Sequence, residues 1–329
     1  MKRFALGLLA ATAMTVTAYA ETPAIVYDLG GKFDKSFNEA AFNGAEQFKE
    51  ETGTQYVEFE IQNEAQREQA LRRFAERGHS PVIIAGFSAA QAVDTVSQEF
   101  PETEFVIIDM VVEQPNVRSV VFKEQEGSYL VGIMAAKASE TGTVGFVGGM
   151  SIPLISRFSC GYKGGVLAAN PDATFIENFT GDTPAAWNDP VKGGEITNAQ
   201  IAQGADVVFA AAGGTGVGVL QAAADAGKLS IGVDSNQNGL QPGSVLTSMM
   251  KRVDVAVYNA MKDGMADGDY AFGVNVLGVA EEGVGVAIDD NNKDLVTDEM
   301  LAAVEEARAK IIAGEIVVHD YMSDNNCPY

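Results

Sequence analysis

The stretch AIVYDLGGKFDKSFNEAAFNGAEQFKEE, residues 24–51, decides the fold. Its first four residues are apolar and β-prone, which predicts a strand, and Asp28 follows where that strand ends. A loop leads into a helix expected over residues 36–51, which opens on Ser36-Phe37-Asn38-Glu39, a capping-box pattern that satisfies free N–H groups. The stretch is typical of a strand–loop–helix unit in an α/β protein.

The same alternation continues along the chain. Further strands are expected at residues 56–59, 82–85, 105–108 and 117–122, and further helices over 64–76 and 88–99. A second series of strands is expected near residues 144–147, 174–177, 207–210, 229–233 and 245–248. The last elements are a helix over 252–265, strands at 272–278 and 284–288, and a helix over 298–313. This count predicts two α/β lobes, each a parallel sheet flanked by helices.

The lobe boundaries follow from the two series. We expect lobe I to comprise residues 21–129 with about 249–271, and lobe II residues 130–248 with about 272–329. No long Pro/Ser linker separates the lobes, so the boundary near residues 126–142 is expected to be a short crossover. Such crossovers act as hinges.

The N-terminus predicts export. Lys2-Arg3 precedes an apolar run over residues 4–16, and Ala18-Tyr19-Ala20 offers the small residues that signal peptidase needs. We interpret residues 1–20 as a cleaved signal peptide, because the run is shorter than the roughly 20 apolar residues of a spanning helix. No cysteine lies near the cleavage point, so we expect a periplasmic protein without a lipid anchor.

Composition and charge exclude several functions. The chain has 329 residues, 47% of them hydrophobic, which is ample for two domains. The signal peptide carries two of the 22 basic side chains and none of the 45 acidic ones, so the mature net charge is −25. Nucleic acids and anionic membranes bind cationic patches, and neither partner is expected. His79 and His319 lack Cys or acidic neighbours at ligand spacing, so no metal, cofactor or His-based triad is expected.

The chain has two cysteines, Cys160 and Cys327. In an oxidising compartment the sequence is compatible with a disulfide between them and equally with two unpaired thiols. A bridge would close a loop of well over 100 residues and hold the C-terminal tail. Neither cysteine has a neighbouring histidine, so no nucleophilic role is indicated.

Aspartates at strand ends are the most informative local feature. Asp28 follows Ala-Ile-Val-Tyr, Asp109 follows Phe-Val-Ile-Ile, and Asp234 follows Ile-Gly-Val. Ligands of open parallel sheets bind beyond the carboxyl ends of the strands, where such carboxylates would converge on a polar molecule. The alternative is that each aspartate caps the next helix or turn. Because Asp28 and Asp109 belong to the first lobe and Asp234 to the second, convergence across a cleft would favour function.

Two aromatic residues in predicted loops are a second indication of a binding site. Phe33 lies in a loop rich in glycine and charge, and Trp187, the only tryptophan, lies in the polar segment 181–190. A single tryptophan is more often packing than a ligand platform, but two loop aromatics that face one cleft could sandwich a planar ring.

Two motifs resemble known sites without matching them. The run GGTGVG at residues 213–218 lacks the P-loop lysine and the dinucleotide glycine spacing, and is better interpreted as a helix N-terminus that closely approaches a ligand or the sheet. The run DSNQNG at residues 234–239 begins like a calcium loop, but Val245 occupies the position that requires glutamate. No calcium site is expected.

Several segments together resemble the basic membrane protein (BMP) family, the solute receptors of ABC transporters. They are DLGGKFDKSFN (28–38), VGFVGGM (144–150), WNDP (187–190), AGGTG (212–216) and IGVDS (231–235). The resemblance covers nearly the whole mature chain. It implies a type I periplasmic binding protein, with two doubly wound lobes joined by three crossovers and a ligand cleft between them. It also implies a purine nucleoside as ligand and an ABC permease in the inner membrane as partner.

The resemblance further implies a set of ligand-binding residues. They are Phe33 and Trp187 for stacking on the base, Asn38 and Asp109 for its edge, Asp234 and Lys251 for the ribose, and, more loosely, Asp28 and Gly214. Family members are often lipoproteins, whereas this chain lacks the lipid-bearing cysteine. The stacking position that is often Phe in the family is Trp187 here.

The chemistry of these residues fits a nucleoside of the guanosine, inosine or adenosine type. Asp109 could accept two N–H bonds from a guanine-like edge, whereas adenine offers it one donor and one acceptor. Asp234 accepts and Lys251 donates, so together they can bind vicinal hydroxyls.

Three other functions remain open. A receptor for a sugar or other small polar solute would use the same fold and similar side chains. An exported nucleoside hydrolase would need an aspartate-rich metal cluster or an acid/base pair, and its calcium-type spacing is absent. A surface antigen would need no cleft. We expect a monomeric binding protein that is not an enzyme.

Overall fold

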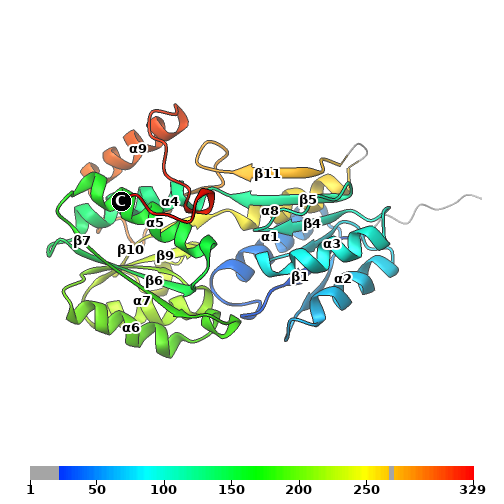
Figure 1. Ribbon diagram of the computed structural model, residues 1–329, viewed down its shortest axis with the longest axis horizontal. Coiled ribbons are helices and arrows are strands. Elements are labelled where there is room, and N and C mark those ends of the chain that lie inside the picture. The colour runs from blue at the N-terminus through cyan, green and yellow to red at the C-terminus, as the bar shows by residue number, and fades with distance from the viewer. Residues whose placement is uncertain (1–21, 267–269) are drawn as a thin grey trace, which may run out of the picture.

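The computed structural model describes residues 22–266 and 270–329, so the expected signal peptide lies outside the described residues. Two six-stranded sheets, each flanked by helices, form two lobes that lie side by side (Figure 1). The strand orders are β11-β5-β4-β3-β1-β2 in lobe I and β12-β10-β9-β8-β6-β7 in lobe II. All strand pairs are parallel except the pair that β10 forms with β12, which is antiparallel. The expected architecture of two parallel α/β lobes is confirmed.

Lobe I contains the first elements of the chain. They are β1 (Ala24–Tyr27), α1 (Phe37–Thr52), β2 (Val57–Glu60), α2 (Gln66–Glu76), β3 (Val82–Ile84), α3 (Ala90–Glu99), β4 (Phe105–Ile108) and β5 (Val117–Phe122). The strands β1, β3 and β4 are buried along their whole length. They are continuous apolar runs because helices cover both faces of a parallel sheet.

Lobe II follows without a linker. Its elements are α4 (Glu124–Ala138), β6 (Thr143–Met150), α5 (Pro153–Ala169), β7 (Thr174–Gly181), α6 (Pro190–Ala202), β8 (Val207–Ala211), α7 (Gly216–Asp225), β9 (Leu229–Asp234) and β10 (Val245–Lys251). The chain then forms α8 (Val253–Gly264), which packs on α1, followed by β11 (Gly273–Leu277), β12 (Val284–Val286) and α9 (Asp298–Ile312).

The crossovers between the lobes differ from the expected boundaries. The segment expected as a short crossover is α4, whose residues 124–135 are buried because α5, α9, β10 and β12 surround it. Lobe II therefore begins near residue 124 instead of 130. In addition, β10 stays in the sheet of lobe II up to Lys251, two residues beyond the expected return at 249.

The strand β11 is a second correction. Residues from 272 onward were expected in lobe II, but β11 pairs in parallel with β5 at the edge of the lobe I sheet (Figure 1). The chain crosses to lobe II only after Leu277, where β12 pairs with β10. An exposed strand of five residues carries no sequence signal for the sheet that it joins.

The N-terminus of α1 is capped differently from the expected capping box. Asp34 accepts N–H bonds from Ser36, Asn38 and Glu39 at 2.8, 3.0 and 3.1 Å. The Ser36 hydroxyl instead donates to Asp234 of lobe II. The capping box fails because a carboxylate two residues earlier takes its place, which leaves Ser36 free to link the lobes.

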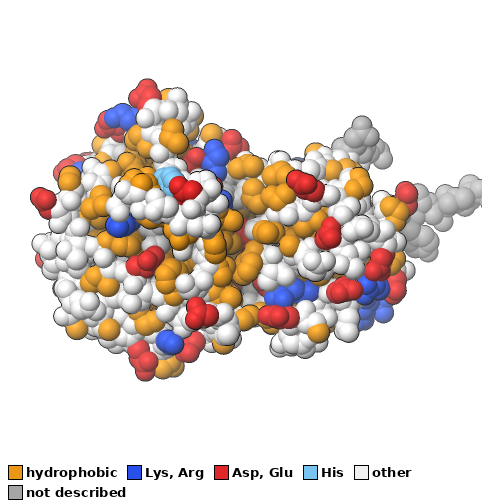
Figure 2. Space-filling view, viewed as in Figure 1, with side chains coloured by type: hydrophobic (Ala, Val, Ile, Leu, Met, Phe, Trp, Pro, Cys, Tyr) orange, Lys and Arg blue, Asp and Glu red, His pale blue; other side chains and the backbone are white. Residues whose placement is uncertain are grey.

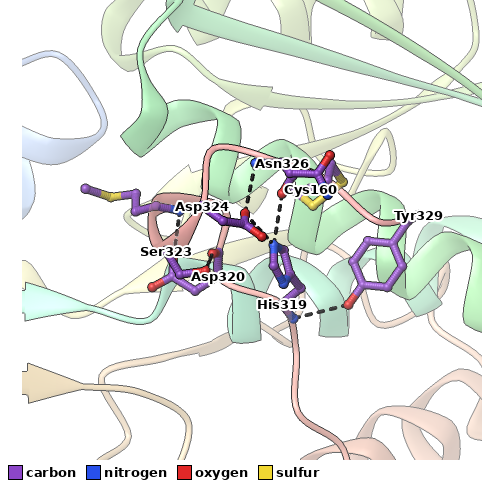
Figure 3. Close-up of a disulfide and its surroundings, with 9 residues drawn as sticks. Cys160, His319, Asp320, Ser323, Asp324, Asn326 and Tyr329 are labelled. Carbon is purple, nitrogen blue, oxygen red and sulfur yellow. Dashed lines mark hydrogen bonds and ion pairs between the residues drawn. A yellow bond between two sulfur atoms is a disulfide. The ribbon is translucent and has the colours of Figure 1, made fainter.

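The C-terminal segment after α9 returns to α5 (Figure 3). A disulfide joins Cys160 of α5 to Cys327, with Cα atoms 5.6 Å apart. The backbone N–H of His319 donates to the Tyr329 hydroxyl at 3.2 Å. Gly164 gives the Tyr329 ring room, because a Cβ there would lie 2.7 Å from the ring. The tail is thus fixed along α5.

Candidate functional site

A cavity lies between the lobes, at the carboxyl ends of β1, β4, β8, β9 and β10. It holds about 620 Å³ of empty space, part of it open to solvent. Figure 2 shows hydrophobic side chains gathered where the two lobes meet. The structure brings together most of the predicted site residues in its lining, which includes Asp28, Asn38, Asp109, Trp187, Asp234 and Lys251.

Two predicted residues lie outside the lining. Phe33 is 59% exposed, and its ring packs edge-on against Phe42 with centroids 5.2 Å apart. Lys32 also covers this ring, with Nζ 4.9 Å from its centroid, so Phe33 is held on the outside of lobe I. The Phe33 ring is therefore not part of the cavity lining in this structure. Gly214 lies just behind the lining, where a Cβ would be 3.3 Å from the carbonyl oxygen of Trp187.

Sequence reasoning missed an apolar wall of the cavity. Its members are Phe37, Phe87, Leu154, Ile155 and Phe158. The last three lie in the first turns of α5, which begins just after the carboxyl end of β6. The position of α5 directly after β6 could have indicated these residues, because the first turn of a helix after a parallel strand lies at the cleft edge of the sheet.

Trp187 lies in a short 3-10 turn (Pro184–Trp187) after β7. Its indole packs directly on Gly149, where any Cβ would clash with the ring. The ring is partly buried against the core and also lines the cavity. A glycine at position 149 thus makes room for an aromatic surface in the wall of lobe II.

Lys251 ends β10 and is 2% exposed. Its ammonium lies 2.7 Å from Asp109 Oδ2 and 3.0 Å from Glu124 Oε1. The rings of Phe37, Phe122 and Phe158 surround it, with centroids 5.1 to 5.5 Å away. Burial alone would lower the pKa of Lys251, but the nearby carboxylates raise it above its ordinary value. Lys251 is therefore a fixed cation in the cleft.

The two carboxylate oxygens of Asp109 have different surroundings. Oδ2 accepts from Lys251, while Oδ1 is buried and has no hydrogen-bond partner among the described residues. Burial raises the pKa of Asp109 to about 6, with Lys251 opposing the rise and Glu124 adding to it. Its backbone is also in the left-handed region, with φ of 75°. An unpartnered acceptor in a cavity wall costs free energy until a donor reaches it.

Asp234 faces the cavity from the other lobe. Burial raises its pKa to about 6, whereas Lys251 and the Ser36 hydroxyl lower it. Its backbone φ is 62°, also left-handed. Besides the Ser36 bond, the Ser235 hydroxyl donates to the carbonyl of Ser36 at 2.9 Å. This loop of lobe II therefore meets the start of α1 directly.

Asp28 and Asn38 are already engaged with neighbouring groups. The Asp28 carboxylate accepts from Arg67 at 2.9 Å and from Ser88 at 3.2 Å. The Asn38 amide accepts from the N–H of Asp28 and donates to the carbonyls of Asp28 and Gly31. Both residues line the cavity, and both also fix the loop after β1.

The arrangement suits binding of a polar molecule that has a planar apolar part. The described residues contain no cluster of three or more His, Cys, Asp or Glu side chains that could hold a metal ion. Within the same residues, no helix has the length and apolar character needed to cross a membrane.

Comparison with known proteins gives the family of this fold and cleft. A family model, Bmp, described as ABC transporter substrate-binding protein PnrA-like, matches residues 22–321. The CD4+ T-cell-stimulating antigen of Listeria monocytogenes is 34% identical, over 90% of this chain and 87% of that protein. The ABC transporter nucleoside-binding protein BmpA of Lactococcus lactis is 32% identical, over 90% and 88% of the two chains.

A solved structure agrees with these relatives. The ABC transporter solute-binding protein of Aeropyrum pernix superposes with a TM-score of 0.83 at 30% identity, and the match covers 91% of this chain and 94% of that one. The matches include both lobes and the cleft between them. The resemblance seen in the sequence is thereby confirmed, and this chain belongs to the Bmp family of ABC transporter substrate-binding proteins.

Proposed function

We propose that this protein captures a purine nucleoside in the cleft and delivers it, chemically unchanged, to an ABC permease in the inner membrane. The observation that carries the proposal is the buried Asp109 Oδ1, which has no partner among the described residues. The neighbouring oxygen is held by Lys251, so the carboxylate is fixed in orientation. A guanosine-type or inosine-type edge presents N–H donors that satisfy such an acceptor.

Trp187 and the apolar wall support a planar base. The indole is braced by Gly149, and Leu154, Ile155 and Phe158 supply further apolar surface from α5. Stacking of a base on an aromatic side chain contributes roughly 1–3 kcal/mol and hardly depends on which base is bound. The base would then be selected by Asp109 instead of by the stacking surface.

Asp234 and Lys251 support a ribose. The ammonium has three N–H donors, one of which donates to Asp109. A further donor and the Asp234 carboxylate can bind neighbouring hydroxyl groups. The name of the Lactococcus lactis relative, a nucleoside-binding protein, agrees with this assignment.

A receptor for a free sugar is the second candidate. The observation that favours it is the number of carboxylates in the lining, since Asp28, Asp34, Asp109 and Asp234 all suit hydroxyl groups. The apolar wall favours the nucleoside, because a sugar without a base would leave it without a partner.

Titration of the purified protein with guanosine, inosine, adenosine, uridine and ribose tests the proposal. We expect saturable binding of purine nucleosides and recovery of the intact nucleoside by chromatography. Asp109→Asn should lose affinity for guanosine, whereas Asp290→Asn, at an exposed turn, serves as a matched control. Ribose bound as tightly as guanosine, or release of free base at a catalytic rate, would refute the proposal.

We also propose that the mature protein is a monomer exported to the periplasm by a signal peptide at residues 1–20. N-terminal sequencing of the exported protein should begin at Glu21. The protein should fractionate with the periplasm and elute at the size of one chain. Recovery in the detergent phase would show a lipid anchor instead.

A further inference from the structure

A row of alternating charges runs from the C-terminal segment to the ligand cavity. The Asp320 carboxylate accepts from Arg157 Nε and Nη2 at 2.7 and 2.9 Å. Arg157 Nη1 donates to Glu124 Oε2 at 2.9 Å. The other oxygen of Glu124 lies 3.0 Å from Lys251 Nζ, and that ammonium holds Asp109. The row therefore ends on two residues of the proposed ligand site.

Most of this row is buried. The side chains of Glu124 and Lys251 are 1% and 2% exposed, and that of Arg157 is 13% exposed. Charges in such surroundings are strongly coupled, and removal of one partner leaves the other unpaired at a high cost. Arg157 Nη1 also donates to the carbonyl of Phe122, the last residue of β5. Arg157 thus fixes the backbone of the crossover that leads to Glu124.

We propose that Arg157, oriented by Asp320, is a positioning residue of the ligand site, which holds Glu124 and through it sets Lys251 and Asp109. Arg157 is not part of the cavity lining, so it acts without touching the ligand. Only the affinity measurements that test this inference depend on the proposed nucleoside binding.

The tail that carries Asp320 is attached to the same helix as Arg157. Cys160 lies one turn after Arg157 on α5, and its disulfide to Cys327 fixes the segment that follows Asp320 (Figure 3). The Asp320 carboxylate also accepts the N–H of Met322, which orders its own turn. The orientation of Arg157 is therefore determined from outside the cleft.

The charge of Arg157 has a distinct electrostatic effect on Asp109. The charged groups facing Asp109 are Lys251 of β10, Glu124 of α4 and Asp234 of β9. Glu124 raises the pKa of Asp109, and Arg157 offsets the charge of Glu124. Without Arg157, Glu124 would draw Lys251 toward itself and repel Asp109 more strongly. The pKa of Asp109 would then rise further, and its ionised form would be lost at a higher pH.

The test compares Arg157→Gln with Arg157→Lys and Asp320→Asn. Asp324→Asn is the control, because Asp324 lies in the same tail but contacts His319 instead of Arg157. Affinity for guanosine is measured between pH 5 and 9 from the Trp187 emission. We expect Arg157→Gln to weaken binding about tenfold near neutral pH and to move the acid limb of the profile up by about one pH unit. Arg157→Lys, which keeps the charge, should keep the midpoint, and Asp320→Asn should give a smaller loss.

A second measurement needs no ligand. The pKa of Asp109 is followed by carboxyl NMR in the free wild-type protein and in the variants, and Arg157→Gln should raise it. If wild type binds no nucleoside, the proposed function fails, and this titration still decides the role of Arg157. An unchanged Asp109 titration, or an affinity loss that is uniform at every pH, would mean that Arg157 only stabilises the fold. Should Arg157→Gln not fold, Asp320→Asn and Arg157→Lys undergo the same two measurements.

Discussion

Three aspartates in the cavity lining titrate well above their ordinary range. Burial raises the pKa of Asp34, Asp109 and Asp234 to about 6 in each case. Lys251 is the one cation in the lining among the described residues, and it is already paired with Asp109 and Glu124. The cleft therefore carries an excess of negative charge that is sensitive to mild acid.

We predict that acid affects ligand affinity and stability in opposite directions. If guanosine needs ionised Asp109, its affinity falls as the pH drops through about 6. The three carboxyls have higher pKa values in the folded than in the unfolded chain, so the folded state binds more protons between about pH 4 and 6. The free energy of unfolding of the ligand-free protein should therefore increase on going from pH 7 to 5. Calorimetric titration and thermal unfolding at both pH values measure the two effects, and a parallel loss of both would contradict the prediction.

The two aromatic residues expected to stack on the base should now behave differently. Trp187→Ala should weaken guanosine binding by about 1–3 kcal/mol, because one stacking surface is lost. Trp187→Phe should retain most of the affinity. Phe33→Ala is the matched control and should bind normally, since that ring lies outside the cavity. Equal losses in Phe33→Ala and Trp187→Ala would show that Phe33 moves into the cleft when ligand binds.

The start of α1, in lobe I, also touches lobe II through Asp234 and Ser235. We predict that Asp34→Ala lowers the free energy of unfolding by about 0.5–2 kcal/mol, the usual effect of losing a helix cap. Ser36→Ala should lower that free energy less, because its hydroxyl makes one hydrogen bond, to Asp234, and caps nothing. Ser36→Ala should instead speed ligand release, since the bond to Asp234 links the lobes. Urea denaturation measures the free energy of unfolding, and stopped-flow fluorescence measures the rate of ligand release. A larger loss of stability in Ser36→Ala than in Asp34→Ala would mean that Ser36 is the cap.

The packing of α4 on α5 depends on glycine. A Cβ on Gly165 would collide with the carbonyl of Tyr129 in α4, so the helices pack backbone to backbone. Gly165→Ala should destabilise the protein by about 1–3 kcal/mol through overpacking. Gly194→Ala is the control, because its Cβ would meet Gly218 O at 3.4 Å, an ordinary contact. It should be neutral or slightly stabilising, since alanine favours a helix. Similar losses in both variants would argue against close α4–α5 packing.

Most elements follow from their sequence alone, and the exceptions have physical causes. The strands β1 and β4 have the predicted bounds because uninterrupted apolar runs of that length fit a sheet that is covered on both faces. By contrast, the sheet joined by β11 and the contact between Ser36 and Asp234 depend on which distant segments meet in the folded chain. No local pattern contains that information.

At the scale of the whole molecule, the site residues converge because the chain passes between the lobes three times. Asp109 and Asp234 end strands of different sheets, and their convergence follows the rule for carboxyl ends of parallel strands. The position of Phe33 could not be predicted in this way, since a loop side chain is placed by its neighbours Phe42 and Lys32. The charged row through Arg157 was equally out of reach, because its five members come from five separate segments.

The disulfide gives a prediction for the intact protein. Thiol titration of the exported protein under denaturing, non-reducing conditions should find no free thiol, because Cys160 and Cys327 are paired. After reduction the same titration should find both. Two reactive thiols before reduction would contradict the pairing.

The same bond makes residues 160–327 a covalent ring. A protease that cuts this ring once would leave a nicked protein of two polypeptides that still migrates as one species without reductant. The ring contains β7 to β10 of lobe II and also α8 and β11, which return to lobe I. A single nick would therefore leave both lobes attached through the bridge, and only reduction would release the second polypeptide.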